Sequence, residues 1–335
     1  MSTGSRPGSG RSVVRMLARG VWLFLTCALV ALPAGCGGGE VHDAGTTPSA
    51  SSPPATPGAQ AIASPWQRGT ADAAQTAEVA ELYAVAMHDE NVQDVVPYAA
   101  QATLDNWVTG THVSGVDMIR ATWVDWESGV DWSLPPFYVA AEDEEGRSGA
   151  AVLETVAVDH RRSPEVQVPC LVLLAVSDGR VIHEETFADP HLDVARTAGP
   201  TPCPEPEARG SDSAAWSGKV AGWLATAEEK GDWATLRTLY SADVVFLDTS
   251  RKEPLRGITA TVDWHRAAGF GSSVQLDAEA PLSGEGWALL RWTARAADSE
   301  GDRISVPGVT MLEIRDGRIA RETIYYDSSI VPLSR

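Results

Sequence analysis

The sequence has few positive charges. Its 26 lysines and arginines stand against 45 aspartates and glutamates, which gives a formal net charge of −19. Nucleic-acid surfaces and polybasic lipid-docking segments need clustered positive charge, so the charge balance argues against both. Because 44% of the residues are hydrophobic, the 335-residue chain can build a sizeable core, and its length suits two ordinary domains.

The sequence also lacks the familiar spacings of metal, nucleotide and nucleophile sites. Its seven histidines are scattered without an H-E-x-x-H pair, and its four cysteines include no closely spaced pair. A P-loop, a dinucleotide glycine fingerprint and a G-x-S-x-G elbow are likewise missing. We therefore expect no metal ion and no cofactor.

Acidic residues are absent from the first 36 positions, where four arginines precede an apolar run from Val21 to Ala34. Fourteen apolar residues are too few for a comfortable membrane span, which needs about 20. A basic segment, a short apolar segment and small residues before a cleavage site are typical of a secretory signal peptide. We expect residues 1–35 to be removed.

The end of this segment, Leu32-Pro33-Ala34-Gly35-Cys36, resembles a bacterial lipobox, in which a cysteine becomes the acylated N-terminus. Pro33 departs from that pattern, which has an aliphatic residue three positions before the cysteine. The resemblance implies a lipoprotein anchored through Cys36 on the outer face of the bacterial cytoplasmic membrane. The alternative is an ordinary signal peptide with an incidental cysteine.

Two stretches rich in Pro, Ser, Thr and Gly divide the rest of the chain. We expect a tether over residues 36–70, a first domain over 71–196, a linker over 197–213 and a second domain over 214–330. The two domains read as copies of one another. Asp178-Gly179-Arg180 matches Asp316-Gly317-Arg318 at an offset of 138, and residues further upstream match at an offset near 142.

Each copy has the same order of expected elements. Helices are predicted over 73–89, 94–100 and 116–126, and over 214–230, 233–240 and 258–268. Strands are predicted over 102–108 and 243–247, followed in each copy by three or four more strands. Asp-Gly between alternating runs predicts a hairpin for the last two strands. Helices first and a mainly antiparallel sheet afterwards indicate an α+β fold.

This order resembles the NTF2-like superfamily and its SnoaL-like branch. The matching stretches are LYSADVVFLDTSRKEPLRGITATVDW, from Leu239 to Trp264, and VPGVTMLEIRDGRIARETIYYD, from Val306 to Asp327. The resemblance implies two tandem cones, each with a bent sheet around a long helix and an apolar pocket at one end. It leaves function open, because the fold hosts isomerases, dehydratases, hydrolases, cyclases and binding modules.

Two residues are catalytic candidates. Asp248 stands where the steroid isomerases of the superfamily have their general base, but their acid donors are replaced by Leu224 and Thr310. His265 could pair with Asp248 as an acid/base couple. The alternatives are an aspartate at the pocket mouth or capping a helix, and a histidine that is exposed or at the edge of the core. The first copy has Asn106 and Trp123 at the corresponding positions.

The chain contains twelve tryptophans, which fill a core or line a pocket for a flat apolar ligand. The residues predicted to line the pockets are Asn106, Trp123, Trp264, Trp292, Thr310 and Tyr326. Because the chain is expected outside the cytoplasm, Cys170 and Cys203 are predicted to form a disulfide, with two separate thiols as the alternative.

We therefore expect a membrane-anchored lipoprotein that binds a small apolar molecule or a protein partner without catalysis. The second hypothesis is an isomerase, dehydratase or hydrolase that uses the pocket of the second domain. A third is that the two domains pack together as a pseudo-dimer and serve as an interaction platform.

Overall fold

The computed structural model describes residues 72–140, 149–161, 165–189, 212–251, 253–297 and 303–328. All of them belong to one unit, Ala59–Arg335. The predicted signal peptide and tether, Cys36, Cys203 and almost all of the linker lie outside the described residues. Among the described residues, no helix is long and apolar enough to cross a membrane.

The described residues form an α+β fold with six helices and two seven-stranded sheets. The helices are α1 (Ala73–His88), α2 (Val92–Val95), α3 (Val116–Glu127), α4 (Ala214–Lys230), α5 (Trp233–Leu239) and α6 (Ile258–Ala267). The strands of the first half, residues 72–189, are β1 (Tyr98–Asn106), β2 (Thr111–Ser114), β3 (Val130–Trp132), β4 (Phe137–Val139), β5 (Ala150–Asp159), β6 (Val166–Ser177) and β7 (Arg180–Ala188). Those of the second half, residues 212–328, are β8 (Tyr240–Asp248), β9 (Leu255–Arg256), β10 (Gln275–Ala278), β11 (Leu282–Gly284), β12 (Trp287–Ala297), β13 (Arg303–Arg315) and β14 (Arg318–Tyr326).

The long helices begin and end at residues suited to those positions. Asp72 caps α1 by accepting a hydrogen bond from the Gln75 backbone N–H at 2.7 Å, and Ser213 caps α4 in the same way. Gly231 ends α4 in the left-handed conformation, with φ of 63°. Both helices lie within one residue of their predicted ranges.

The second helix of the first half was predicted wrongly. The prediction placed a helix over 94–100, but α2 ends at Val95 and β1 already begins at Tyr98. Pro97 explains the difference, since a residue before proline is disfavoured in the helical conformation. Val96 accordingly has an extended ψ of 128°.

The two sheets have corresponding topologies. Their strand orders are β2-β1-β7-β6-β5-β3 and β10-β12-β13-β14-β8-β9. Each sheet contains one parallel pair, β1 with β7 and β14 with β8, and its other pairs are antiparallel. The predicted hairpins are confirmed at Asp178-Gly179 and Asp316-Gly317, where both residues have positive φ.

Residues 142 apart occupy the same place in β1 and β8, and residues 138 apart do so in β7 and β14. The first pair of strands has the same pattern of burial, residue by residue. Asn106 pairs with Thr186 in one parallel register, and Asp248 pairs with Ile324 in the other. Positions in the two halves can therefore be compared directly.

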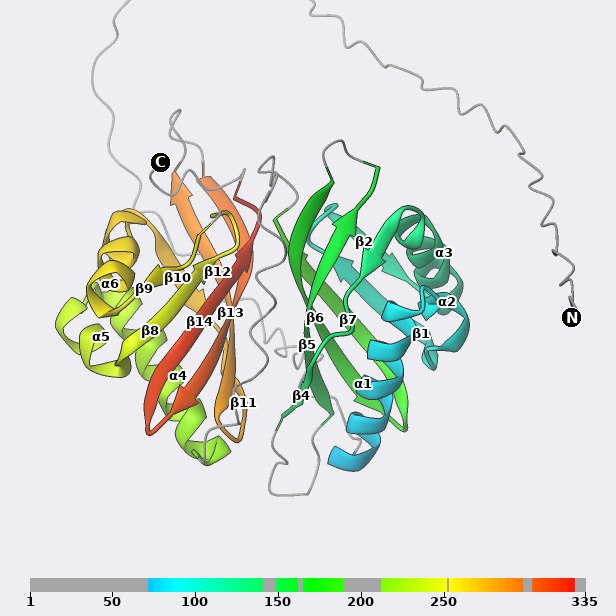
Figure 1. Cartoon of the computed structure of the whole chain (residues 1–335), viewed down its shortest axis with the longest axis horizontal. Coiled ribbons are helices and arrows are strands. Elements are labelled where there is room, and N and C mark those ends of the chain that lie inside the picture. Colours follow the sequence, from blue (N-terminus) through cyan, green and yellow to red (C-terminus); the bar gives the residue numbers. More distant parts are fainter. Residues whose placement is uncertain are drawn as a thin grey trace, which may run out of the picture. The chain divides into compact units, whose positions relative to one another are not determined.

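In each half the helices cover one face of the sheet and enclose a core (Figure 1). A third apolar cluster contains residues of both halves, among them Leu171, Phe187, Leu289 and Tyr325. Alternation along the strands accounts for this arrangement, because successive side chains point to opposite faces of a sheet.

A buried ion pair joins the two halves. The Arg321 guanidinium donates to Glu154 through both of its Nη atoms, one at 3.1 Å, and its Nε donates to Glu313 at 2.8 Å. The Tyr325 hydroxyl donates to Glu154 at 2.8 Å. Because Glu154 lies on β5 and Arg321 on β14, these bonds connect strands of different sheets.

Candidate functional site

Each half contains a buried tyrosine–glutamate pair beneath its first helix. The Tyr98 hydroxyl donates to Glu184 Oε2 at 2.5 Å, and the Tyr240 hydroxyl donates to Glu322 Oε2 at 2.5 Å. All four side chains are buried. The sequence shows the two glutamates at matching positions, but it does not show that they lie inside the core.

Glu184 is fully buried. Burial raises the pKa of its carboxyl to about 7, while the hydrogen bond from Tyr98 acts in the opposite direction. Trp123, one of the predicted pocket residues, is fully buried and packs against Tyr83 and Trp132. It therefore belongs to the core.

The second half has a histidine where the first half has Trp123. His265 is fully buried, and its Nδ1 lies 2.9 Å from Glu228 Oε1. Its Nε2 lies 3.1 Å from the Tyr240 hydroxyl and 3.5 Å from Glu322 Oε2. Burial lowers the pKa of His265, but the two glutamates raise it by more than burial lowers it, so that the pKa is about 10. Burial also raises the pKa of Glu228.

The other catalytic candidate, Asp248, lies in a different environment. Its Oδ1 accepts hydrogen bonds from the Ser250 backbone N–H at 2.9 Å and from the Ser250 hydroxyl at 2.7 Å. Burial raises the pKa of Asp248, and its carboxyl in turn contributes to the raised pKa of Tyr326. Among the interactions described for these residues, none joins Asp248 to His265.

Asn106 has the same place in the first half and a similar local role. Its Oδ1 accepts hydrogen bonds from the backbone N–H groups of Val108 at 2.9 Å and Thr109 at 3.1 Å. Asn106 and Asp248 thus both stabilise the turn that follows the first strand of their sheet.

Three predicted pocket residues meet near Asp248. The Trp292 indole N–H donates to the Thr310 hydroxyl at 2.9 Å, and the Trp292 ring lies 6.2 Å from the Tyr326 ring. A Cβ at Gly308 would lie 2.2 Å from the Trp292 ring, so this position requires glycine. The sixth predicted residue, Trp264, is half-buried and packs on Phe246 instead.

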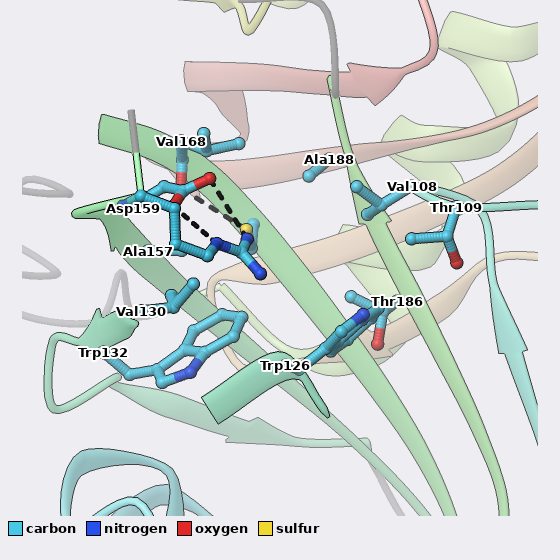
Figure 2. A pocket seen from close by; sticks show the side chains of 12 residues that line it. Val108, Thr109, Trp126, Val130, Trp132, Ala157, Asp159, Val168, Thr186 and Ala188 are labelled. Atoms are coloured by element: carbon cyan, nitrogen blue, oxygen red, sulfur yellow. Dashed lines mark hydrogen bonds and ion pairs between the residues drawn. The ribbon is translucent and has the colours of Figure 1, made fainter. Parts of the chain in front are cut away.

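A pocket of about 220 Å³ opens in the first half. Figure 2 shows the Trp126 and Trp132 rings on one side of it and β7 on another. The residues that line it are Val108, Thr109, Trp126, Val130, Trp132, Ala157, Asp159, Arg161, Val168, Cys170, Thr186 and Ala188. None of the six predicted pocket residues lines it. The clustered tryptophans of this half were one signal that could have indicated it.

Polar groups in this pocket are few. Asp159 and Arg161 form an ion pair with contacts of 2.8 and 3.1 Å (Figure 2). Within the part of the chain that the structure describes, the buried Thr186 hydroxyl and the buried Trp132 indole N–H have no hydrogen-bond partner.

Larger side chains occupy the corresponding place in the second half. Thr186 corresponds to Ile324, and Ala188 corresponds to Tyr326, whose ring lies against Trp292. Tyr326 is 2% exposed and Trp292 is 8% exposed. In the second half, therefore, aromatic rings of the chain fill the space that the first half leaves open.

Comparison with known proteins agrees with the fold. Residues 220–322 match the profile of the SnoaL-like domain. The matched stretch lies within the second half, and the described residues have an α+β topology with two mixed sheets and six helices. A search of the curated proteins found no match.

Several solved structures resemble about a third of the chain. An NTF2-like protein of unknown function from Mesorhizobium loti is 21% identical over 34% of this chain and 93% of its own, with a TM-score of 0.31. An LEH-like epoxide hydrolase of M. tuberculosis is 17% identical over 35% and 87%, with a TM-score of 0.30. A protein with a ketosteroid isomerase-like fold from Catenulispora acidiphila, in complex with trimethylamine, is 19% identical over 34% and 88%, with a TM-score of 0.31.

Proposed function

We propose that the first half binds a small, flat, mainly apolar molecule in the pocket beside Trp126 and Trp132. The pocket is the observation that carries this proposal. Its volume of about 220 Å³ exceeds that of an engineered apolar cavity of about 150 Å³ that binds benzene. A ligand with one or two rings and one polar group matches its size and lining.

The proposed role is binding without catalysis. Asn106 takes the place that Asp248 has in the second half, and an amide cannot accept a proton as a general base. The Asp159 carboxylate, which lines the pocket, forms an ion pair with Arg161 at 2.8 Å. The pocket thus combines an apolar lining with a carboxylate that is paired with an arginine.

In the same proposal, the second half is a second NTF2-like cone that supports the first, and the two pack as a pseudo-dimer. Corresponding topologies, the shared apolar cluster and the bonds between Arg321 and Glu154 support it. The alternative, an isomerase, dehydratase or hydrolase in the second half, requires Asp248 and His265 to act together. Asp248 is hydrogen-bonded to Ser250, whereas His265 contacts Glu228 and Tyr240, and this difference argues against a joint role.

We further propose that the mature chain is a lipoprotein whose acylated Cys36 anchors it on the outer face of the bacterial cytoplasmic membrane. The lipobox-like residues support this, and two or more acyl chains would bind stably. A disulfide between Cys170 and Cys203 also stays a proposal. It would close a loop of about 34 residues and stabilise the fold by roughly 3.5–4 kcal/mol; mass spectrometry that finds two alkylatable thiols would exclude it.

The binding proposal is tested by titrating the full chain with indole and with naphthalene while recording the heat of binding. We expect saturable binding that Ala188→Tyr abolishes, because that variant introduces the ring that fills the second half. Thr186→Ile is a milder change of the same kind and should weaken binding. Val124→Tyr, on an exposed face of α3, is the matched control and should bind like the parent.

Two results would overturn the proposal. One is binding that both pocket variants leave unchanged, because the ligand then lies elsewhere. The other is turnover of cyclic ketones or epoxides that Asp248→Asn and His265→Ala each abolish without unfolding the chain. That second result would establish the enzyme hypothesis.

A further inference from the structure

Four ligand-type side chains lie on one face of three neighbouring strands in the first half. Strands β2, β1 and β7 are adjacent in the sheet. Asp105 on β1 is the cross-strand partner of His112 on β2 and of Glu185 on β7. His183 lies two residues before Glu185 and therefore on the same face.

Two carboxylates converge on a single nitrogen of this cluster. His183 Nε2 lies 3.2 Å from Glu185 Oε1 and 3.7 Å from Asp105 Oδ2. Ligand atoms of a tetrahedral zinc ion, with bonds of about 2.0–2.1 Å, lie about 3.3–3.4 Å apart. The first separation is close to this value and the second is somewhat longer, and ligand atoms of Asp105, His183 and Glu185 all lie within 4.8 Å of one another. His112 contacts the other oxygen of Asp105 and can supply a fourth ligand.

The second nitrogen of His183 is held by a hydroxyl group. Its Nδ1 lies 2.6 Å from Thr103 Oγ1. Histidines that bind metals almost always donate their other N–H to an oxygen, which fixes the ring and leaves the ligating nitrogen unprotonated. Thr103 is placed to accept that hydrogen bond.

The other histidine–carboxylate clusters of the described residues lack this geometry. The carboxylates of Asp131 and Glu165 approach different nitrogens of His160, at 2.9 and 2.8 Å. In the second half, Glu228 and Glu322 likewise approach different nitrogens of His265. In neither of these two clusters do both carboxylates converge on one nitrogen of the histidine.

The charge around His183 also favours a divalent cation. Arg291 of the second half donates to Glu185 Oε1, the oxygen that also faces His183, at 2.6 Å, to Glu185 Oε2 at 3.0 Å and to Glu279 at 2.5 Å. Asp105, Glu185 and Glu279 thus contribute three carboxylates to this group of side chains, and Arg291 contributes one guanidinium. His183 and Glu185 are 4% and 3% exposed, and buried charge of this kind is costly unless it is compensated.

We propose that His183, Asp105 and Glu185, with His112 as a fourth ligand, bind a divalent transition-metal ion such as Zn²⁺. Nitrogen and carboxylate ligands suit zinc and its neighbours in the first transition row. No sequence spacing signals the site, since its ligands come from three strands. The second half does not repeat it, because Arg321 stands at the position of His183 and Leu247 at that of Asp105.

The test is a calorimetric titration of the full chain, purified without an oligohistidine tag, with Zn²⁺. We expect one equivalent to bind. His183→Ala and Asp105→Asn should each weaken binding by about 100-fold or more, and Thr103→Val by about 10- to 100-fold. His160→Ala is the control and should bind Zn²⁺ like the parent. It removes a histidine whose two neighbouring carboxylates approach different ring nitrogens. Co²⁺ should show visible ligand-field absorption that His183→Ala removes.

Three results would overturn the proposal: no Zn²⁺ binding by the parent chain, unchanged binding in His183→Ala, or an equal loss in His160→Ala. Asp105 is partly exposed, so we expect Asp105→Asn to fold. It therefore tests the site even if the variant of the buried His183 fails to fold. Because the metal cluster shares no residue with the pocket, failure of either proposal leaves the other standing.

Discussion

Removing the charge of Glu154 should destabilise the fold strongly. Glu154 is 1% exposed and accepts hydrogen bonds from Arg321 and from the Tyr325 hydroxyl. Breaking a buried ion pair by removing one partner costs about 3–5 kcal/mol, because the other charge stays buried. In Glu154→Gln, Arg321 keeps Glu313 at 2.8 Å, so we expect the lower end, about 3 kcal/mol.

The assay is urea unfolding of the full chain at pH 7, followed by tryptophan fluorescence. The double variant Glu154→Leu/Arg321→Met removes both charges and should cost at least about 1 kcal/mol less than the sum of the single variants Glu154→Leu and Arg321→Met. Asp277→Asn is the control, since its pair with Arg295 at 2.8 Å is exposed on both sides. Such pairs contribute about 0.2–1 kcal/mol.

Two outcomes would refute this reasoning. One is a Glu154→Gln variant within about 0.5 kcal/mol of the parent, the size of an ordinary surface substitution. The other is strict additivity of the two single variants, since residues without a shared interaction add. Either result would mean that the two halves do not pack through Glu154 and Arg321.

Three further predictions concern single residues. The pKa of Glu184 is raised to about 7 in the folded chain, so stability should fall by about 3 kcal/mol between pH 4.5 and 7 and then level off; Glu184→Gln should remove this fall in urea titrations across that range. The pKa of His265 is raised to about 10, so its stabilisation should be complete below pH 6.5 and be lost as the pH rises to 10. His265→Trp leaves Glu228 and Glu322 without their cation and should cost about 3–5 kcal/mol at pH 7; a loss below 1 kcal/mol would contradict the ion-pair account. Cys36→Ser should release the chain from the membrane fraction, and a variant that still sediments with membranes would contradict lipid anchoring.

The sequence predicts much of the fold because local signals and tertiary packing agree there. Asp-Gly specifies its hairpins through two left-handed residues, and Gly231 ends α4 by the same freedom. Where the signals disagree, prediction fails. A helix is predicted over 94–100, but Pro97 disfavours the helical conformation at the residue before it, and β1 begins at Tyr98.

The candidate sites were harder to predict, because their partners are distant in sequence. His265 was recognised, yet Glu228 on another helix and Glu322 on the last strand decide its charge. The pocket stays open because the side chain of Ala188 is small, and a single alanine is part of no recognisable motif. Comparison of Ala188 with Tyr326 at the matching position was the signal that could have located it.

The most direct measurement of the central claim is a crystal structure of the chain soaked with indole. Binding in the first half predicts electron density for the ring against Trp126 and Trp132. Density beside Asp248 in the second half, or a pocket that stays without ligand at saturating indole, would contradict the claim.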